Sequence, residues 1–395
     1  MSRQPVYINW GISSFFGWGV YGLNLALHWS SDPDLALICT QPVDESQFAQ
    51  DPLRLQALVG MVERSRQLEA RLEGHGGKRA TVPGPMLASC DHQFGVNPAV
   101  HGVVLTGTPN LSVTFFETAQ LEPDAVARAA TRPAVITGST WNTQVLGAHG
   151  LTNVRKVIQG VDPGLFHPAP RLGLLADRFC VFSGGKLERR KGQDIVLAAF
   201  RRFAARHPDA LLVTAWHSPW PEAARTVDAS ALVGPVVFNA EGHVDVTEWA
   251  LANGIAAENI LDLGGVPNAQ MPALLNEMDV ALFPNRAEGG TNLVAMECMA
   301  CGVPVILSAN TGHLDLVEDN NCYPLVRQGV LVGWEAPFAD VAGWGESDLD
   351  EVVDALERVY ADRAEARARG LRGAAFIGQY SWARTAAEMK DIVLA

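Results

Sequence analysis

The feature that most constrains the fold is an alternation of short apolar runs with longer segments of helical period, which occurs twice along the chain. In the first half we predict strands at Pro5–Trp10 and Leu35–Thr40, and helices at Tyr21–Trp29 and Gln47–Glu73. The series of strand, turn and helix starts again at Phe179–Ser183. Strands that alternate with helices form parallel sheets with helices on both faces. The sequence therefore predicts an α/β protein with two Rossmann-like, doubly wound parallel-sheet domains.

A stretch rich in proline and glycine separates the two halves. Residues Gln159–Arg171 contain three prolines and two glycines, a composition typical of an interdomain linker. We place the first domain at residues 1–168 and the second at residues 169–379, and expect them to face each other across a cleft. Ligands of such folds bind at the carboxyl ends of the strands, beside helix N-termini. The turns that follow the strands are therefore the places to look for function.

Charge, cysteine content and hydropathy exclude several classes of protein. The net charge is −13, so the chain lacks the surplus of Lys and Arg that neutralises nucleic-acid phosphates. The six cysteines are scattered and several lie in apolar runs, which is typical of reduced thiols in a cytoplasmic protein. No apolar run reaches the ~20 residues that span a bilayer, and the N-terminus lacks the layout of a signal peptide. We predict a cytoplasmic protein and leave open a peripheral contact with the inner membrane face.

Three glycines between the first strand and the first helix have the spacing of a dinucleotide-binding turn. They are Gly17, Gly19 and Gly22. The second strand ends in Thr40-Gln41, without the acidic residue that would hold a ribose diol, which disfavours NAD or flavin binding. We interpret the glycines as a loop that admits a ligand; a tight turn without a ligand is the alternative.

The turn after the first strand of the second half is the first candidate for anion binding. Residues Ser183–Asp194 combine glycines with four basic side chains, and a helix is predicted to start near Gln193. Glycines let the backbone approach an anion, and the helix offers its positive end. We assign diphosphate binding to Lys186 and Lys191. The two arginines between them, Arg189 and Arg190, are predicted to be solvated.

A second Gly-rich loop follows the predicted strand Val280–Phe283. A helix is predicted to begin near Leu293, with Thr291 or Asn292 as its N-cap, and to end at Gly302. Loop amides and the helix N-terminus form an anion cradle. Glu288 in the loop and Glu297 on the helix are candidates to accept hydrogen bonds from vicinal sugar hydroxyls. Glu297 has apolar neighbours, and a buried carboxylate is costly unless it binds something.

Other patterns that resemble functional sites are interpreted as structural. Cys298 and Cys301 have redox-motif spacing but lie within a predicted helix, so we expect packing thiols. The acid pairs Asp32-Pro-Asp34 and Asp348-Leu-Asp350 have no His or Cys partners nearby in the sequence. We therefore predict no metal site.

These segments together resemble the retaining glycosyltransferases of family four, which have the GT-B architecture, over nearly the whole chain. Val157–Pro168 resembles the interdomain signature of that family and Ser183–Asp194 its diphosphate-binding turn. Glu288–Gly302 resembles its double-glutamate motif. Tyr380-Ser-Trp382 precedes a final helix that crosses back onto the N-terminal domain in relatives. The resemblance implies that residues 380–395 complete the first, acceptor-binding domain and that the second domain binds the donor.

The resemblance also implies a role for each motif. Glu288 would hold the donor sugar, Glu297 the ribose, and Lys186 and Lys191 the leaving diphosphate. The candidate catalytic residues are thus Glu288, Lys191, Lys186 and Glu117. The remaining residues implied to line the donor are Gly17, Gly19, Val266, Gly289, Gly290, Thr291, Asn292 and Leu293.

Two departures from the family pattern concern the glutamates. Eight residues separate Glu288 from Glu297, whereas the family usually has seven. In addition, Glu117 follows the strand after which many members of the family have a histidine. A glutamate and a neutral histidine differ in charge, so the role of Glu117 does not follow from the resemblance.

We therefore predict an enzyme that transfers a sugar from a nucleoside-diphosphate sugar to an acceptor hydroxyl with retention, without a metal or other cofactor. The acceptor would be a glycan, a lipid-linked glycoconjugate or a small molecule. A sugar-nucleotide epimerase, a phosphorylase and a non-catalytic sugar-nucleotide binder remain alternatives. The sequence does not fix the donor base, the sugar, the acceptor or the oligomeric state.

Overall fold

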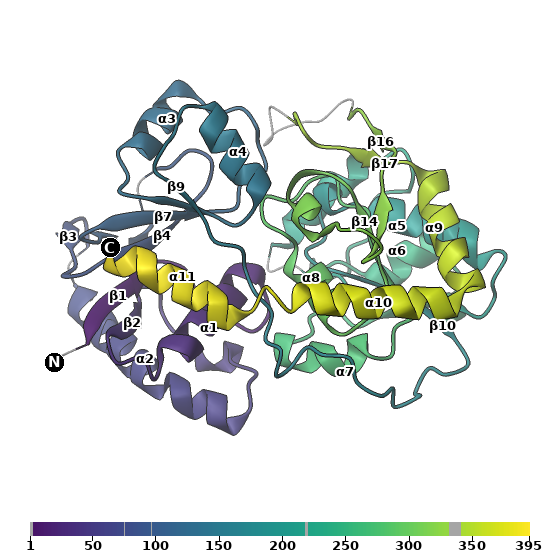
Figure 1. The fold of residues 1–395 in the computed structure, drawn as a ribbon, viewed down its shortest axis with the longest axis horizontal. Helices are drawn as coiled ribbons and strands as arrows, with labels where there is room; N and C mark the ends of the chain where they lie inside the picture. Colours follow the sequence, from purple (N-terminus) through teal and green to yellow (C-terminus); the bar gives the residue numbers. More distant parts are fainter. Residues whose placement is uncertain (1–2, 75, 96, 218–219, 332–340) are drawn as a thin grey trace. The chain divides into compact units, whose positions relative to one another are not determined.

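The chain forms two compact α/β units (Figure 1). The computed structural model describes residues 3–74, 76–95, 97–217, 220–331 and 341–395. The first unit contains the residues up to Gly160, the short segment Pro267–Ala269, and Tyr380–Ala395. The second contains Val161–Val266 and Gln270–Gln379. Each unit is built around one six-stranded parallel sheet, as the alternation of strands and helices predicts.

The first unit has the strand order β2-β1-β4-β7-β8-β9, with all neighbouring strands parallel. A smaller three-stranded sheet has the order β3-β6-β5. Strand β2 is entirely apolar and buried, as expected when helices cover both faces of a parallel sheet. The strands of this unit are β1 (Gln4–Ile8), β2 (Leu35–Cys39), β3 (Arg79–Thr81), β4 (Met86–Cys90), β5 (Ala99–Val100), β6 (Val103–Thr106), β7 (Asn110–Thr114), β8 (Val135–Thr137) and β9 (Val154–Lys156).

The helices of the first unit begin where caps and prolines allow. For example, α2 begins after Asp51, whose side chain accepts from the amides of Leu53 and Arg54, so the helix starts later than the predicted Gln47. The helices are α1 (Gly17–Trp29), α2 (Pro52–Leu72), α3 (Pro123–Ala130), α4 (Thr140–Ala148) and α11 (Trp382–Leu394).

The predicted glycine loop is wrong, because Gly17, Gly19 and Gly22 lie inside α1, which begins at Gly17 rather than at Tyr21. A Cβ on Gly19 would lie 2.6 Å from the Cβ of Ser13, and one on Gly22 would lie 2.9 Å from Nε1 of Trp10. Two of the three glycines therefore let the helix pack closely on the chain that leads into it, which explains their spacing without a dinucleotide.

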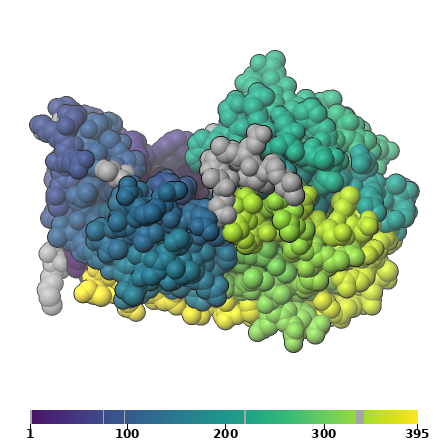
Figure 2. Space-filling model, turned by 90° about the horizontal axis from the view of Figure 1, so that it is seen from above, coloured from purple at the N-terminus to yellow at the C-terminus, as the bar shows by residue number. Residues whose placement is uncertain are grey.

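Helix α11 belongs to the first unit although it follows the whole of the second unit in sequence. It packs along α1: Trp29 donates from Nε1 to the carbonyl of Ala386 at 3.1 Å, and the rings of Tyr21 and Trp382 stack with centroids 5.6 Å apart. In the space-filling view, its yellow residues border the blue residues of the first unit (Figure 2). The predicted return of the C-terminal helix is confirmed.

The second unit has the strand order β12-β11-β10-β13-β14-β15, again with parallel neighbours. Its strands are β10 (Phe179–Gly184), β11 (Ala210–Ala215), β12 (Ile260–Asp262), β13 (Val280–Phe283), β14 (Val305–Ser308) and β15 (Tyr323–Leu325), with a small antiparallel pair β16 (Gln328–Gly329) and β17 (Glu346–Ser347). Its helices are α5 (Gln193–Ala204), α6 (Val246–Ala252), α7 (Met271–Leu275), α8 (Leu293–Ala300), α9 (Leu349–Ala361) and α10 (Arg363–Ile377).

The order of strands in the second unit places a switch point between β10 and β13. From β10 the chain proceeds outward through β11 and β12, and from β13 it proceeds the other way through β14 and β15. At such a point the loops that leave the two central strands diverge and expose a crevice at the carboxyl edge of the sheet. Both Gly-rich turns singled out in the sequence begin there. Of the helices in the described ranges, none is long and apolar enough to cross a membrane.

Candidate active site at the carboxyl edge of the second sheet

The first wall of the site is the turn that connects β10 to α5. It contains a short 3₁₀ turn at Arg189–Lys191 and then Gly192, which has a left-handed φ of 74°. A Cβ at this position would lie 2.3 Å from the carbonyl oxygen of Pro284, so only glycine lets the turn approach the loop after β13. Helix α5 begins at Gln193, as predicted.

The second wall is the loop between β13 and α8. The predicted cap is confirmed: Asn292 is the N-cap of α8, and its side chain accepts from the amide of Ala295. Asn292 has a φ of 68°, a conformation that asparagine tolerates better than most residues. Gly312 approaches the same loop, because a Cβ there would lie 1.7 Å from the carbonyl oxygen of Gly290. The loop backbone is thus fixed from two sides.

Glu288 is the centre of the polar network between these walls. Its side chain is buried, and three side chains donate to it: Lys191 at 2.5 Å, Arg190 at 3.3 Å, and the amide of Asn285. Its own backbone amide donates to Oγ1 of Thr311 at 2.8 Å. A carboxylate has about four acceptor positions, so the three donors leave it capacity for one more hydrogen bond.

The prediction that Arg190 is solvated is wrong. Its side chain is 8% exposed and forms ion pairs with Glu188 and Glu288, and it donates to the carbonyl of Ala287 at 2.7 Å. The reason is non-local, since Glu288 is 98 residues away in the sequence. Four consecutive charges in a turn do not indicate which side chain turns inward, so sequence reasoning missed Arg190.

Lys186 joins the network through Glu188 rather than directly. Its ammonium lies 2.7 Å from Glu188, which also binds Arg190. The ammonium is also 5.8 Å from the ring centroid of the exposed Trp220. Lys186 remains 34% exposed, whereas Lys191 is 16% exposed. The two predicted lysines therefore lie at the outer and inner ends of one chain of alternating charges.

The electrostatics keep Glu288 ionised. Burial alone would raise the pKa of its carboxyl, but Lys191 and Arg190 outweigh burial and lower the pKa to about 2. The pKa of Glu188 is lowered in the same way, against burial, by Arg190 and Lys186. The site thus contains two carboxylates and three cations that hold each other charged inside a largely buried environment.

A separate buried ion pair connects the two turns that form the site. Arg286 and Asp194 form a bidentate pair at 2.8 and 2.7 Å, with side chains 1% and 0% exposed. Arg286 also donates to the carbonyl of Arg189 and lies 3.2 Å from Glu346. Because Asp194 is in the first turn of α5, the pair ties the turn after β10 to the loop after β13. Arg286 therefore has a structural role, because it holds the two turns together.

His313 is a further buried residue of this region, beside the cap of α8. Its Nε2 lies 3.1 Å from Nδ2 of Asn292, and its Nδ1 lies 3.2 Å from the carbonyl oxygen of Ser308. The amide nitrogen of Asn292 can only donate, so Nε2 accepts and the proton of the neutral ring resides on Nδ1. Burial lowers the pKa of His313 to about 4, although Glu288 acts in the opposite direction.

We expect this histidine to make the protein less stable in acid. Between pH 6.5 and 4 the unfolded state binds a proton at His313 and the folded state does not, so stability falls as the pH falls through this window. A shift of this size corresponds to about 3 kcal/mol. A His313→Gln variant should show a flatter dependence of unfolding free energy on pH, measured by urea denaturation. Equal slopes for both proteins would contradict the assignment.

The other predicted donor residues lie in two places. Gly289, Gly290 and Thr291 are buried in the loop after β13, Leu293 is the first residue of α8, and Glu297 is buried on that helix. Val266 is half-buried in the loop after β12. Gly17, Gly19 and Glu117 belong to the first unit; Glu117 is half-buried three residues after the end of β7. The network around Glu288 thus contains two of the predicted residues in direct contact, Lys191 and Glu288.

The acid pairs discounted in the sequence have structural partners. Asp32 and Asp34 both bind the ammonium of Lys390 on α11, at 2.8 and 2.7 Å. Asp348 caps α9 by accepting from the amide of Glu351. Cys298 and Cys301 are buried, and burial raises the pKa of both thiols.

The family model of glycosyl transferases group 1 matches residues 170–335. Nearly all of the matched residues lie in the second unit, which is similar to that family over most of its length. The match covers both walls of the site and confirms the resemblance inferred from the motifs.

Characterised relatives are similar over part of the chain. A GDP-mannose-dependent alpha-(1-6)-phosphatidylinositol monomannoside mannosyltransferase of Mycolicibacterium smegmatis is 25% identical over 249 residues, covering 59% of this chain and 54% of the relative. A D-inositol 3-phosphate glycosyltransferase of Segniliparus rotundus is 28% identical over 259 residues, covering 62% and 49%. The chain thus spans about half the length of the curated relatives it matches.

Solved structures match over the whole chain at low identity. A sucrose-phosphate synthase from Thermosynechococcus elongatus has a TM-score of 0.63 with 18% identity and covers 98% of both chains. HepE from Anabaena, in complex with UDP and glucose, has a TM-score of 0.62 with 13% identity and covers 100% of both. These similarities confirm the predicted GT-B fold.

Proposed function

We propose that the protein is a retaining glycosyltransferase that transfers a sugar from a nucleoside-diphosphate sugar to an acceptor hydroxyl. The observation that carries the proposal is the buried contact between Lys191 and Glu288 at the switch point of the second sheet. It joins a cation from one Gly-rich turn to a carboxylate from another, and two helix N-termini begin beside it. A diphosphate requires cations and amides, and a sugar requires a fixed acceptor group; this edge of the sheet supplies both.

In this proposal the donor lies along the two walls. The diphosphate binds Lys186, Lys191 and the amides of the loop from Gly289 to Leu293. Glu288 uses its remaining acceptor capacity for a sugar hydroxyl, and Glu297 accepts from the ribose. Because Lys191 and Arg190 keep Glu288 ionised, its carboxylate accepts hydrogen bonds at any pH near neutrality.

The other predicted residues also have roles in this proposal. Gly17 and Gly19, near the start of α1, line the phosphates, and Glu117 orients the acceptor or touches the donor sugar. Val266, which belongs to the second unit, borders the nucleobase. The names of the relatives, which specify GDP-mannose and inositol-containing acceptors, support including these compounds among the first to be tested.

The chemistry requires stabilisation of the charge that develops on the leaving diphosphate. As the bond to the anomeric carbon breaks, positive charge builds on the sugar and negative charge on the β-phosphate. Fixed lysines and helix amides need no reorganisation to stabilise that charge, which is the most effective form of electrostatic catalysis. The acceptor oxygen forms its bond to the anomeric carbon on the face that the diphosphate leaves, and an oxygen of the leaving phosphate takes the proton of the acceptor hydroxyl. Because the new bond forms on the same face as the old one, the anomeric configuration is retained. We propose that these groups act without a divalent metal.

The test begins with a thermal-shift screen against a panel of sugar nucleotides that includes GDP-mannose and UDP-glucose. A donor that binds the folded state raises the melting temperature. The donor that stabilises most is then incubated with candidate acceptors, and nucleoside diphosphate release and the anomeric configuration of the product are measured. We expect release that depends on the acceptor, retention, and the same rate with EDTA present. Inversion or loss of activity in EDTA would contradict the corresponding part of the mechanism.

The alternatives give different results in the same assay. An epimerase converts the donor sugar in the absence of an acceptor, and a phosphorylase needs inorganic phosphate. A non-catalytic binder shows the thermal shift without turnover. Absence of a thermal shift with every sugar nucleotide would contradict the proposed donor class.

A further inference from the structure

A cavity lies at the opposite edge of the same sheet. It has a volume of about 260 Å³, and all its lining residues belong to the second unit. Phe179 starts β10, Asp279 directly precedes β13, and Pro304 directly precedes β14, so the floor is formed at the amino ends of the strands. The cavity also touches Cys301 and Gly302, at the end of α8 that is remote from the Asn292 cap. It is therefore distinct from the candidate active site.

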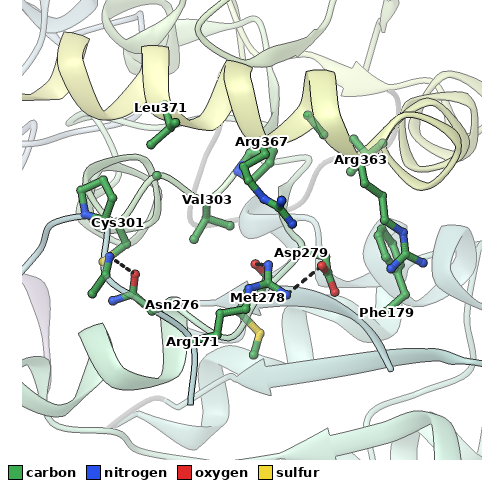
Figure 3. Close-up of a pocket in the computed structure, with 16 residues that line it drawn as sticks. Arg171, Phe179, Asn276, Met278, Asp279, Cys301, Val303, Arg363, Arg367 and Leu371 are labelled. Carbon is green, nitrogen blue, oxygen red and sulfur yellow. Dashed lines mark hydrogen bonds and ion pairs between the residues drawn. The ribbon is translucent and has the colours of Figure 1, made fainter. Parts of the chain in front are cut away.

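Three arginines project into this cavity. Arg171 comes from the segment before β10, and Arg363 and Arg367 come from the first turns of α10. In Figure 3, Arg367 points from α10 toward the pair of Arg171 and Asp279. Among the lining residues, the carboxylate that opposes the three guanidiniums is that of Asp279. The cavity thus carries an excess of positive charge on a chain whose net charge is −13.

Two of the arginines are held in place by the protein. Arg171 binds Asp279 at 2.9 Å and donates to the carbonyl of Met278 at 2.7 Å. Arg363 lies 4.8 Å from the ring centroids of both Phe179 and Tyr360, with Asp209 at 3.7 Å. Within the described ranges, the Arg367 side chain has neither a hydrogen bond nor an ion pair (Figure 3). The N–H groups of its guanidinium are therefore available to bind an anion.

The remaining walls are apolar. Phe179, Met278, Val303 and Leu371 line the space between the guanidiniums (Figure 3). A cavity of about 260 Å³ lies just below the roughly 300–1,000 Å³ of pockets for drug-sized ligands. It suits one ring or a short chain rather than a whole nucleotide sugar. Asp279 pairs with Arg171 and Asp209 lies beside Arg363, so the guanidinium of Arg367 is the one left to bind an anion. Its planar set of donors can bind two oxygens of a phosphate monoester at once.

We propose that this cavity binds a small phosphate monoester with an apolar body, with Arg367 as the principal anion-binding residue. The phosphate binds the guanidinium of Arg367 with Arg171 and Arg363 beside it, and the apolar body packs on Met278, Val303 and Leu371. The cavity is lined in part by the C-terminal end of α8. A ligand in it therefore contacts the end of the helix whose N-terminus forms part of the candidate donor site. Binding of a phosphate monoester in this cavity does not depend on the proposed enzymatic activity, so a binding measurement is sufficient to test it.

The experiment uses phenyl phosphate as the probe, with isothermal titration calorimetry on the full chain. Inorganic phosphate supplies the anion without the ring, benzyl alcohol supplies the ring without the anion, and benzoate supplies a single charge. We expect phenyl phosphate to bind at least about tenfold more tightly than each of the three. Absence of saturable binding of phenyl phosphate, or equal affinity for inorganic phosphate or benzyl alcohol, would overturn the proposal.

Substitutions of single arginines test whether phenyl phosphate binds in this cavity. Arg367→Met should weaken phenyl phosphate at least about tenfold, and Arg367→Lys, which keeps the charge, should weaken it less. Arg202→Met is the matched control, because Arg202 is an exposed arginine of α5 paired with Asp350 outside the cavity. Arg367 is exposed, so these changes leave the core intact. Unchanged affinity in Arg367→Met would overturn the proposal.

Binding at the candidate donor site is the competing explanation, and two further measurements separate the two sites. Lys191→Met should bind phenyl phosphate as the wild type does, and saturating UDP should not displace the probe. Loss of the probe in Lys191→Met, or its displacement by UDP, would assign the binding to the donor site and overturn the proposal.

Discussion

Lys191→Ala is expected to lower the rate of sugar transfer by about 10²–10³-fold while the protein remains folded. The lysine is the inner cation of the turn after β10 and lies 2.5 Å from Glu288. In the proposed mechanism it stabilises the additional negative charge that develops as the diphosphate leaves, so its loss lowers kcat more than it raises KM. The folded state should survive because Arg190 and Asn285 still donate to Glu288.

Steady-state kinetics with the donor selected by thermal shift measure this effect. Lys191→Arg keeps the charge and should recover part of the rate, whereas Arg225→Ala removes an exposed arginine of the same unit and should leave the rate unchanged. A rate close to that of the wild type in Lys191→Ala would remove this residue from the mechanism.

Asp194→Asn is expected to destabilise the second unit by about 3–5 kcal/mol, the largest effect on stability that we predict. The change keeps the shape of the side chain but removes the charge that faces Arg286, whose guanidinium is 1% exposed. A buried cation without its partner costs far more than the pair contributes. The remaining carboxylate near Arg286 in the described structure is Glu346, at 3.2 Å and 34% exposed.

Urea unfolding followed by tryptophan fluorescence measures the loss, because Trp216 and Trp249 lie in the core of the second unit. The matched control is Asp350→Asn, which breaks the pair of Asp350 and Arg202, 68% and 43% exposed. Exposed pairs contribute about 0–1 kcal/mol, so the control should lose little. Equal losses in the two variants would contradict the role assigned to the buried pair.

The stability that the pair of Asp194 and Arg286 contributes also depends on pH. Burial raises the pKa of Asp194, but Arg286 outweighs burial and the pKa is lowered overall. A carboxyl whose pKa is depressed by folding contributes stability above its unfolded pKa and loses it as the pH falls through the folded value. The contribution is therefore complete at neutral pH and is lost only in strong acid.

The features that follow from local chemistry could be predicted from the sequence. The strand Val280–Phe283, the Asn292 cap and the start of α5 at Gln193 each depend on residues within a few positions of one another. The alternation of strands and helices was sufficient for the fold class because it repeats along both units.

The errors concern contacts between segments that are far apart in sequence. Arg190 is buried by Glu288 and Ala287, which lie on another loop. Gly19 is required by the approach of Ser13 to α1, a packing contact that resembles a ligand-binding signature when only the spacing is read. His313 likewise could not be singled out from the sequence, because its hydrogen bond with Asn292 forms only in the folded chain.

The position of α11 has a consequence for the order in which the protein can be assembled on the ribosome. Tyr21 and Trp29 are buried partly by Trp382 and Ala386, which are synthesised after all of the second unit. Domains generally fold as units during synthesis. The second unit can therefore acquire its native structure while the first, although made earlier, still exposes the apolar face of α1. The first unit is thus the one most exposed to aggregation during translation.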